Sequence, residues 1–295
     1  MIRKISISEI CSALSLSWVG EDVQIQSLYL AGRSTIFSSV LSYASTSQWL
    51  ESLLHEKAVQ AAIVCKSDMP DNMDTTVTIR AWIFSEDPEC TFYGIHDFLL
   101  DHTDFYDKFQ SAPLIGEGCH IHPTAVINPG VQIGNHVHID PFVVLFSGTQ
   151  IGNNAKIDCG AAIGGDGFQS IRAKEKIRTV RHCGQVLIGN DVHIGSHTVI
   201  HRSLFEGATT IGHGSKLDAL TYVAHNCLIG ENVVITAGVV LCGSAIIESG
   251  VWLGPNASVL NKVIVGKGSM VGMSSAVTRE VPPSTLVYGV PAKKK

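Results

Sequence analysis

Residues 223–247 read VAHNCLIGENVVITAGVVLCGSAII, with a large aliphatic side chain at every sixth position. These positions are Val223, Ile229, Ile235, Leu241 and Ile247. A period of six fits neither the 3.6-residue period of a helix nor the two-residue alternation of a strand. It is typical of a chain that turns a corner every six residues and points one large apolar side chain per face into a triangular prism. Three such faces make one coil, and successive coils stack by parallel β hydrogen bonding.

The same spacing covers most of the chain. It runs from Ile115 to Ile163 without a miss, resumes from Ile188 to Ile200, and continues from Ile211 to Val277. These positions predict a mainly β protein built on a parallel β-helix of about eight coils. The spacing does not give the handedness of the coil.

Composition excludes several classes of protein. The 295 residues carry a formal net charge of -5 with scattered Lys and Arg, so we expect no nucleic-acid partner. No apolar stretch approaches the ~20 residues of a membrane-spanning helix, so we expect no integral membrane segment. The first residues lack the apolar run of a secretion signal. The eight cysteines show no CxxC spacing, which predicts a reduced, cytoplasmic protein.

The histidines do not predict a metal site. His120, His122, His136 and His138 fall at corner or outward positions of the early coils, and no carboxylate is spaced to complete a zinc site with them. We therefore expect no bound metal.

Residues 1–108 lack the six-residue period and predict a small α/β domain. Ser6 to Leu14 predicts a helix that Ser6 caps, and Asp87-Pro88 opens a second helix that reaches Leu100. Ala58 to Cys65 and Thr76 to Trp82 predict strands. Residues 109–281 predict the β-helix domain, and the chain is expected to leave the prism at Pro282-Pro283, so that 282–295 form a tail.

Two interruptions break the period, near 164–185 and 201–210. Insertions in such a coil are tolerated at corners, where they project outward and line a binding face. The outer faces carry apolar residues such as Val234 and Trp252. Three prisms side by side would cover these faces, so we predict a homotrimer with sites between subunits.

One corner carries residues suited to acyl transfer. His225 follows an inward position, and Gly243 occupies the same place one coil later. A histidine beside a glycine N–H provides a base near pH 7 and a donor for an oxyanion. A solvated corner histidine beside a corner glycine remains the alternative. Cys227 or Cys242 as a nucleophile is a further alternative, although Cys227 points inward and Cys242 has no evident base.

Two aromatic residues of the first domain, Tyr43 and Trp49, lie six residues apart around an expected turn. Aromatic pairs sandwich nucleobases. The alternative is one aromatic residue in the core and one on the surface.

Together these residues resemble the UDP-3-O-acylglucosamine N-acyltransferases of lipid A synthesis, the LpxD family, within the hexapeptide acyltransferases. The similarity covers nearly the full length, and Ala224-His225-Asn226 at its place in the repeat is its most specific element. It includes the segments Leu41 to Trp49, Asp87-Pro88, Gly165 to Phe168, Thr198 to Arg202 and Lys216 to Asp218.

The resemblance implies a left-handed coil, a homotrimer, His225 as general base and Gly243 N–H as oxyanion donor. It also implies that Tyr43 and Trp49 stack on the uracil of a UDP-amino sugar. The other substrate-binding positions that it implies are Thr46, Asp218, Asn226 and Lys262. The acyl donor is expected to be acyl carrier protein or a CoA thioester, with no permanently bound cofactor.

The chain departs from the family at several of these positions. Thr46 stands where the family has Asn, Lys262 where it has a histidine associated with the acyl chain, and His201 where it has Asp. Where the family has a C-terminal helical extension, the segment from Pro282-Pro283 through Val287 to Lys293 resembles the end of CoA-dependent sugar acetyltransferases.

These departures leave three alternatives open. The first is a CoA-dependent N-acetyltransferase of a UDP- or dTDP-amino sugar for O-antigen or capsule. The second is O-acylation, in which the same histidine activates a hydroxyl group. The third is a non-catalytic hexapeptide scaffold.

Overall fold

The structure, a computed structural model, describes residues 3–33, 35–68, 78–173 and 176–294. The chain divides into two compact units. The N-terminal unit comprises Met1–Lys108 together with Phe168–Arg181, and the C-terminal unit comprises Phe109–Gly167 and His182–Lys295. The first segment of the N-terminal unit therefore ends at Lys108. The segment Phe168–Arg181, however, was expected in a loop of the β-helix and belongs to the N-terminal unit.

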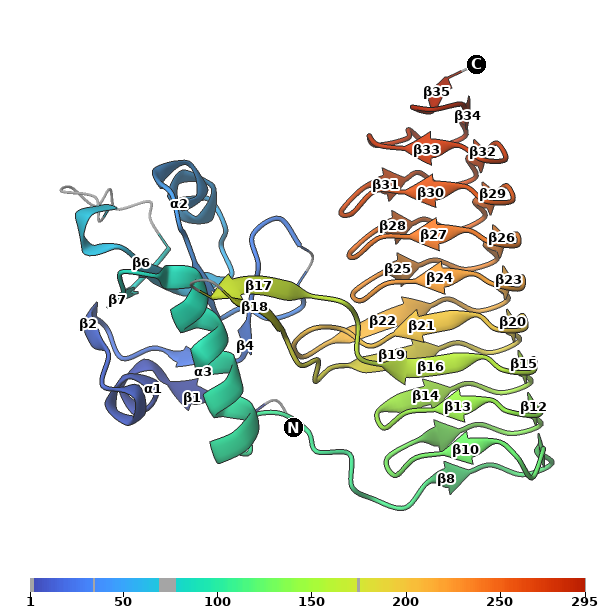
Figure 1. The fold of residues 1–295 in the computed structure, drawn as a ribbon, viewed down its shortest axis with the longest axis horizontal. Coiled ribbons are helices and arrows are strands. Elements are labelled where there is room, and N and C mark those ends of the chain that lie inside the picture. The colour runs from blue at the N-terminus through green and yellow to red at the C-terminus, as the bar shows by residue number, and fades with distance from the viewer. Residues whose placement is uncertain (1–2, 34, 69–77, 174–175, 295) are drawn as a thin grey trace. The chain divides into compact units, whose positions relative to one another are not determined.

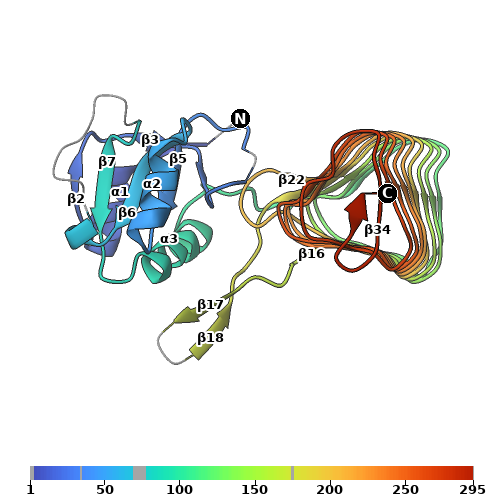
Figure 2. The same cartoon turned by 90° about the horizontal axis from the view of Figure 1, so that it is seen from above.

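A five-stranded sheet forms the centre of the N-terminal unit (Figure 2). Its order is β2-β7-β6-β5-β4, with β2 antiparallel to β7 and the other neighbours parallel. The strands are β2 (Ser17–Gly20), β4 (Ser27–Leu28), β5 (Val40–Tyr43), β6 (Val59–Val64) and β7 (Ala81–Phe84). A separate antiparallel pair joins β1 (Ile5–Ser6) to β3 (Gln24–Ile25).

The predicted strand over 58–65 is confirmed as β6, but the strand predicted over 76–82 is wrong in position. Thr76 and Val77 lie outside the described residues, and Thr78 to Arg80 are not in a strand. The ladder with β6 pairs Ala81 with Ala61 and ends at Phe84. Ala81, Trp82 and Ile83 are all buried, as expected for a strand covered on both faces.

Three α-helices belong to this unit: α1 (Ile7–Leu14), α2 (Ser47–Leu54) and α3 (Pro88–His102), and Lys66–Asp68 form a 3₁₀ turn. The Ser6 hydroxyl accepts from Glu9 N, so the predicted cap of α1 is confirmed. Asp87 caps α3 and Pro88 opens it, as predicted. Between Tyr43 and Trp49 the chain bends at Ser45 and Thr46, where a turn was expected, and then enters α2, a helix that was not predicted. Thr46 caps this helix through its side-chain oxygen.

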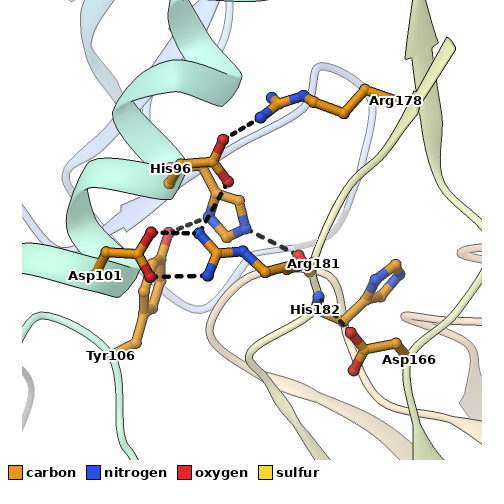
Figure 3. Close-up of polar contacts among 8 residues, drawn as sticks. His96, Asp101, Tyr106, Asp166, Arg178, Arg181 and His182 are labelled. Atoms are coloured by element: carbon orange, nitrogen blue, oxygen red, sulfur yellow. Dashed lines mark hydrogen bonds and ion pairs between the residues drawn. The ribbon is translucent and has the colours of Figure 1, made fainter.

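The first insertion forms an antiparallel hairpin of β17 (Ser170–Ala173) and β18 (Lys176–Thr179). Charged residues hold it to α3. Arg178 pairs with Asp97, and Arg181 binds both carboxylate oxygens of Asp101 at 2.8 Å (Figure 3). The Arg181 carbonyl also lies 2.9 Å from His96 Nε2. These bonds to α3 explain why the segment belongs to the N-terminal unit.

The C-terminal unit is a left-handed parallel β-helix of triangular outline (Figures 1 and 2). The first face contains β8 (Leu114–Ile115), β11 (Gln132–Ile133), β14 (Thr149–Ile151), β19 (Gln185–Ile188), β22 (Ala208–Ile211), β25 (Leu228–Ile229), β28 (Ile246–Ile247) and β31 (Ile264–Val265). The second face contains β9 (His120–Ile121), β12 (His138–Ile139), β15 (Lys156–Ile157), β20 (His193–Ile194), β23 (Lys216–Leu217), β26 (Val234–Ile235), β29 (Trp252–Leu253), β32 (Met270–Val271), β34 (Leu286–Tyr288) and β35 (Lys293–Lys294). The third face contains β10 (Val126–Ile127), β13 (Val144–Leu145), β16 (Ala162–Gly165), β21 (Val199–His201), β24 (Tyr222–Val223), β27 (Val240–Leu241), β30 (Ser258–Val259) and β33 (Ala276–Val277).

The register confirms the period. Strands pair with the equivalent strand one coil later, as Leu241 does with Val259. Every marker residue from Ile133 onward is buried in one continuous core. Ile115 is 52% exposed instead of inward-packed, because no coil lies below the first one to cover it.

The expected exit at Pro282-Pro283 is wrong. β34 pairs in parallel with β32, so the second face gains one more rung. Val281 follows Val277 after only four residues, so the register shifts, but Val281 and Val287 are six residues apart and both are buried in the core. Burial of these two side chains keeps the chain on the prism beyond the prolines.

No helix in the described part of the chain is long and apolar enough to cross a membrane.

Candidate active site

His225 and Gly243 meet at one corner of the β-helix. His225 lies two residues after β24 and Gly243 two residues after β27, the next strand of the same face. A Cβ added to Gly243 would lie 2.8 Å from His225 Cε1 and 2.9 Å from Nε2. The imidazole therefore packs directly against the glycine backbone, and only a residue without a side chain fits there. The stacking expected from residues one coil apart is present.

Asn226 sets the orientation of this imidazole. Its Oδ1 accepts from Leu204 N at 3.1 Å, which identifies that amide atom as the oxygen. The same oxygen lies 2.9 Å from His225 Nδ1. An oxygen that already accepts one hydrogen bond can only accept from the imidazole as well, so Nδ1 carries the proton. Nε2, on the side of Gly243, then has the lone pair that a general base requires.

A second histidine lies against the first. The His182 and His225 rings lie edge to face, with centroids 5.3 Å apart, and both residues are buried. A Cβ on Gly167 would lie 2.8 Å from His182 Nε2 and 3.2 Å from His225 Cδ2. The corner therefore contains two imidazoles, packed between the backbones of Gly167 and Gly243.

The loop that carries Gly167 is held by Arg202 and Asp166. Arg202 Nε donates to Gly164 O at 2.6 Å and lies 3.6 Å from Asp166 Oδ1. Asp166 Oδ2 accepts from His182 N at 3.2 Å (Figure 3). Burial lowers the pKa of Arg202, and the Asp166 charge opposes that effect. Residues Gly164 to Gly167 thus form one wall of the corner.

His201 and Tyr222 extend the same wall. Their rings lie 5.2 Å apart, and His201 Nδ1 lies 3.3 Å from Gly165 O. Burial lowers the pKa of His201 below its ordinary value, so this side chain is neutral at pH 7. It adds no charge beside the histidine pair.

The N–H of Gly243 donates to no acceptor among the described residues, whereas its carbonyl accepts from Lys262 N at 3.1 Å. Next to it, Ser244 Oγ is buried and has no hydrogen-bond partner within the described chain. A backbone donor is therefore available where an oxyanion would form beside His225.

The other β-helix residues singled out by sequence lie at two corners. Lys262 is exposed at the same corner as His225, one coil beyond Gly243. Asp218 follows β23 on another face, at a different corner, and its carboxylate accepts from Ala219 N at 2.7 Å. Thus Asn226 and Lys262 are grouped with His225, and Asp218 is not.

The two cysteines near this corner are poorly suited to act as nucleophiles. Burial raises the pKa of Cys227 to about 12, and burial also raises the pKa of Cys242. Both thiols are therefore protonated at pH 7, and the thiolate is the reactive form.

In the N-terminal unit, Tyr43 ends β5 and Trp49 lies in the first turn of α2. Their ring centroids are 6.1 Å apart. Tyr43 is buried and donates to Glu89 Oε1 at 2.9 Å, whereas Trp49 is 51% exposed. Thr46 Oγ1 accepts from Trp49 N, so this side chain caps the helix. The pair is adjacent, with one ring in the core and the other accessible.

Among the described residues, no group of three or more His, Cys, Asp or Glu side chains is arranged to hold a metal ion.

Sequence comparison identifies the repeat. Residues 112–147 and 208–243 match the family described as bacterial transferase hexapeptide (six repeats). These two segments carry hexapeptide transferase repeats. The second segment contains both His225 and Gly243. No curated protein sequence matches the chain.

Solved structures with similar coordinates include UDP-N-acetylglucosamine acyltransferases. The Moraxella catarrhalis RH4 O-acyltransferase (LpxA) is 27% identical, with 62% of this chain and 72% of that chain covered and a TM-score of 0.42. The Francisella novicida enzyme is 26% identical, with coverages of 60% and 67% and a TM-score of 0.43. The Bacillus cereus N-acyltransferase AntD, a mutant in complex with dTDP and coenzyme A, is 20% identical, with coverages of 64% and 84% and a TM-score of 0.30.

Proposed function

We propose that this protein is an N-acyltransferase that acts on a nucleotide-linked amino sugar. It would transfer an acyl group from a phosphopantetheine thioester to the amine of a UDP-linked glucosamine derivative, as in lipid A synthesis. We assign a 3-hydroxyacyl group as the group transferred. The observation that carries the proposal is the arrangement of His225 between Asn226 and Gly243 within a hexapeptide transferase repeat.

The geometry supports a direct displacement at the thioester carbonyl. The amine attacks the carbonyl carbon while His225 Nε2 removes its proton. Gly243 N–H donates to the oxyanion of the tetrahedral intermediate. The C–S bond then breaks as the carbonyl re-forms, and the imidazolium gives its proton to the departing thiolate. Positioning of both substrates supplies much of the rate, and neither a metal nor a covalent intermediate is part of this scheme.

The nucleotide is assigned to the N-terminal unit. Trp49 presents an accessible indole beside Tyr43, and such a ring stacks on a nucleobase. We assign uracil to this position. The protein would act as a homotrimer, because apolar side chains such as Val234 and Met270 are exposed on one face of the β-helix.

The positions of several lysines favour a second candidate, an acetyl-CoA-dependent N-acetyltransferase. Lys262 presents a cation at the corner of His225, and Lys293–Lys294 form the last strand of the structure. Lysine side chains bind phosphate groups such as those of coenzyme A.

Product identification tests the proposal. The protein is incubated with UDP-amino sugars or their hydroxy analogues, and with acetyl-CoA or a 3-hydroxyacyl carrier protein; products are identified by mass spectrometry. We expect an N-acylated product and a rate ~10²–10⁴-fold lower in the His225→Ala variant. An acylated hydroxy analogue would identify O-acylation instead. Absence of thiol release with every donor, or a His225→Ala rate near wild type, would contradict the proposal.

A further inference from the structure

Arg33 belongs to the N-terminal unit, and its guanidinium lacks the partners that a buried cation usually has among the described residues. Its Nε is buried and has no hydrogen-bond partner among the described residues. Within the same residues, no carboxylate forms an ion pair with Arg33. Arg33 as a residue is nevertheless only partly buried, so part of it is open to solvent.

The surroundings of Arg33 are unusual for an arginine with a purely structural role. Burial lowers its pKa, and the ionisable groups that oppose this shift are the phenols of Tyr93, Tyr43 and Tyr29. Removing a charge from water is strongly unfavourable unless a counter-charge and hydrogen bonds replace the water. Here these neighbours are neutral at pH 7. The Tyr43 hydroxyl donates to Glu89, and the Tyr29 hydroxyl donates to the backbone carbonyl of Arg33.

Arg33 is also linked to the aromatic pair through Tyr43. The Tyr43 and Trp49 ring centroids lie 6.1 Å apart, and the Tyr43 phenol is one of the groups that influence the pKa of Arg33. Tyr43 therefore connects the accessible indole with the guanidinium. Planar guanidinium groups bind the oxygens of a phosphate in a bidentate manner, and this binding would supply the absent counter-charge.

We propose that Arg33 is an anion site of the N-terminal unit that binds phosphoryl oxygens of the nucleotide whose base stacks on Trp49. The assignment to a nucleotide rests on the proposed function. The anion site itself does not, because inorganic pyrophosphate presents the same oxygens without a base.

The experiment compares the full chain with Arg33→Met and with Arg80→Met as the matched control. Arg80 belongs to the same unit but is exposed and paired with Glu21 at 3.0 Å. Uridine and UDP are titrated calorimetrically at constant ionic strength, and inorganic pyrophosphate is followed by melting temperature. We expect Arg33→Met to weaken UDP about 10–100-fold while changing uridine less than about twofold, and Arg80→Met to bind both like wild type.

The outcomes separate the two proposals. Suppose that neither uridine nor UDP binds, yet pyrophosphate raises the melting temperature of wild type and Arg80→Met but not of Arg33→Met. This result would support the anion site at Arg33 and would contradict the assignment of uridine to the N-terminal unit. Unchanged UDP affinity in Arg33→Met, or equal loss of uridine and UDP, would overturn the anion site, as would failure of wild type to bind any of these anions.

Stability gives an independent readout. Because Arg33→Met removes a charge without a counter-charge, the ligand-free variant should melt at the wild-type temperature or above it. A melting temperature several degrees lower would show that Arg33 supports the fold, and would also overturn the proposal.

Discussion

Asn226 Oδ1 accepts a hydrogen bond from His225 Nδ1 at 2.9 Å, and this bond determines which imidazole nitrogen is basic. The same oxygen accepts from Leu204 N, so the amide is fixed from two directions. Asn226 also has a φ of 61°, in the left-handed region that asparagine tolerates better than most residues. One residue thus turns the corner and orients the base.

Replacing Asn226 tests this role. Asn226→Gly keeps the backbone conformation but removes the acceptor, so kcat should fall about 10–100-fold with little change in KM, because the imidazole loses its fixed tautomer and orientation. Asn226→Asp retains an acceptor oxygen and should recover most of the activity. Steady-state kinetics measures both. Equal activity of the Gly and Asp variants would show that the bond does not orient His225.

Gly243→Ala should inactivate the site without unfolding the protein. The new Cβ would lie 2.8 Å from His225 Cε1 and would displace the imidazole, which we expect to lower turnover about 10²-fold. The melting temperature should change little, because Gly243 is not in the left-handed region.

Gly94→Ala is the control, since a Cβ there meets nothing within 4 Å. It should leave turnover unchanged and stabilise α3 by about 0.5–1 kcal/mol. A fully active Gly243→Ala variant would show that Gly243 has no role in the mechanism.

Trp49→Ala should weaken binding of the sugar nucleotide by about 1–3 kcal/mol, the amount that stacking on a base contributes. Because the indole is half exposed, the free energy of unfolding should hardly change. Trp49→Phe keeps an aromatic face and should retain most of the affinity. Calorimetric titration of UDP gives the comparison. Unchanged affinity in Trp49→Ala would make Trp49 an ordinary surface residue.

His96 should make the stability of the protein depend on pH. Burial lowers the pKa of His96 to about 4, from an ordinary value of 6.5. The unfolded chain therefore binds a proton between pH 6.5 and 4 that the folded chain does not bind. The contribution of neutral His96 to the free energy of unfolding is fully present above pH 6.5. This contribution is lost as the pH falls to about 4, and the loss is about 3 kcal/mol in total.

Urea unfolding between pH 7 and 4 measures this effect. His96→Gln should have a flatter profile than wild type, and His55→Gln, at an exposed position, should follow wild type. Parallel wild-type and His96→Gln profiles would show that His96 does not titrate differently on folding.

The β-helix was predictable from sequence because each of its contacts repeats a local rule. A marker such as Leu241 pairs with Val259 one coil later, so the period contains the register. The same rule brought His225 and Gly243 together. The rule failed at both ends of the prism. At the first coil Ile115 is exposed, and at the last coil Val287 adds an unexpected strand to the second face.

The remaining site residues lie where the period is broken. His182 reaches His225 only because an insertion of irregular length returns the chain to the corner, and no spacing in the sequence encodes that return. In the N-terminal unit, α2 was missed because its start is set by one capping bond, from Trp49 N to Thr46 Oγ1, within a short segment of weak period. Arg33 carried no sequence signal, because a buried Nε without a partner among the described residues is a property of the fold and not of a motif.

The hairpin of β17 and β18 also imposes an order of assembly during synthesis. Residues 1–108 leave the ribosome well before Arg178 and Arg181, and the first coils of the β-helix are made in between. During that interval Asp97 and Asp101 cannot yet form their ion pairs with Arg178 and Arg181. The N-terminal unit is therefore completed only after the first coils of the β-helix have been synthesised.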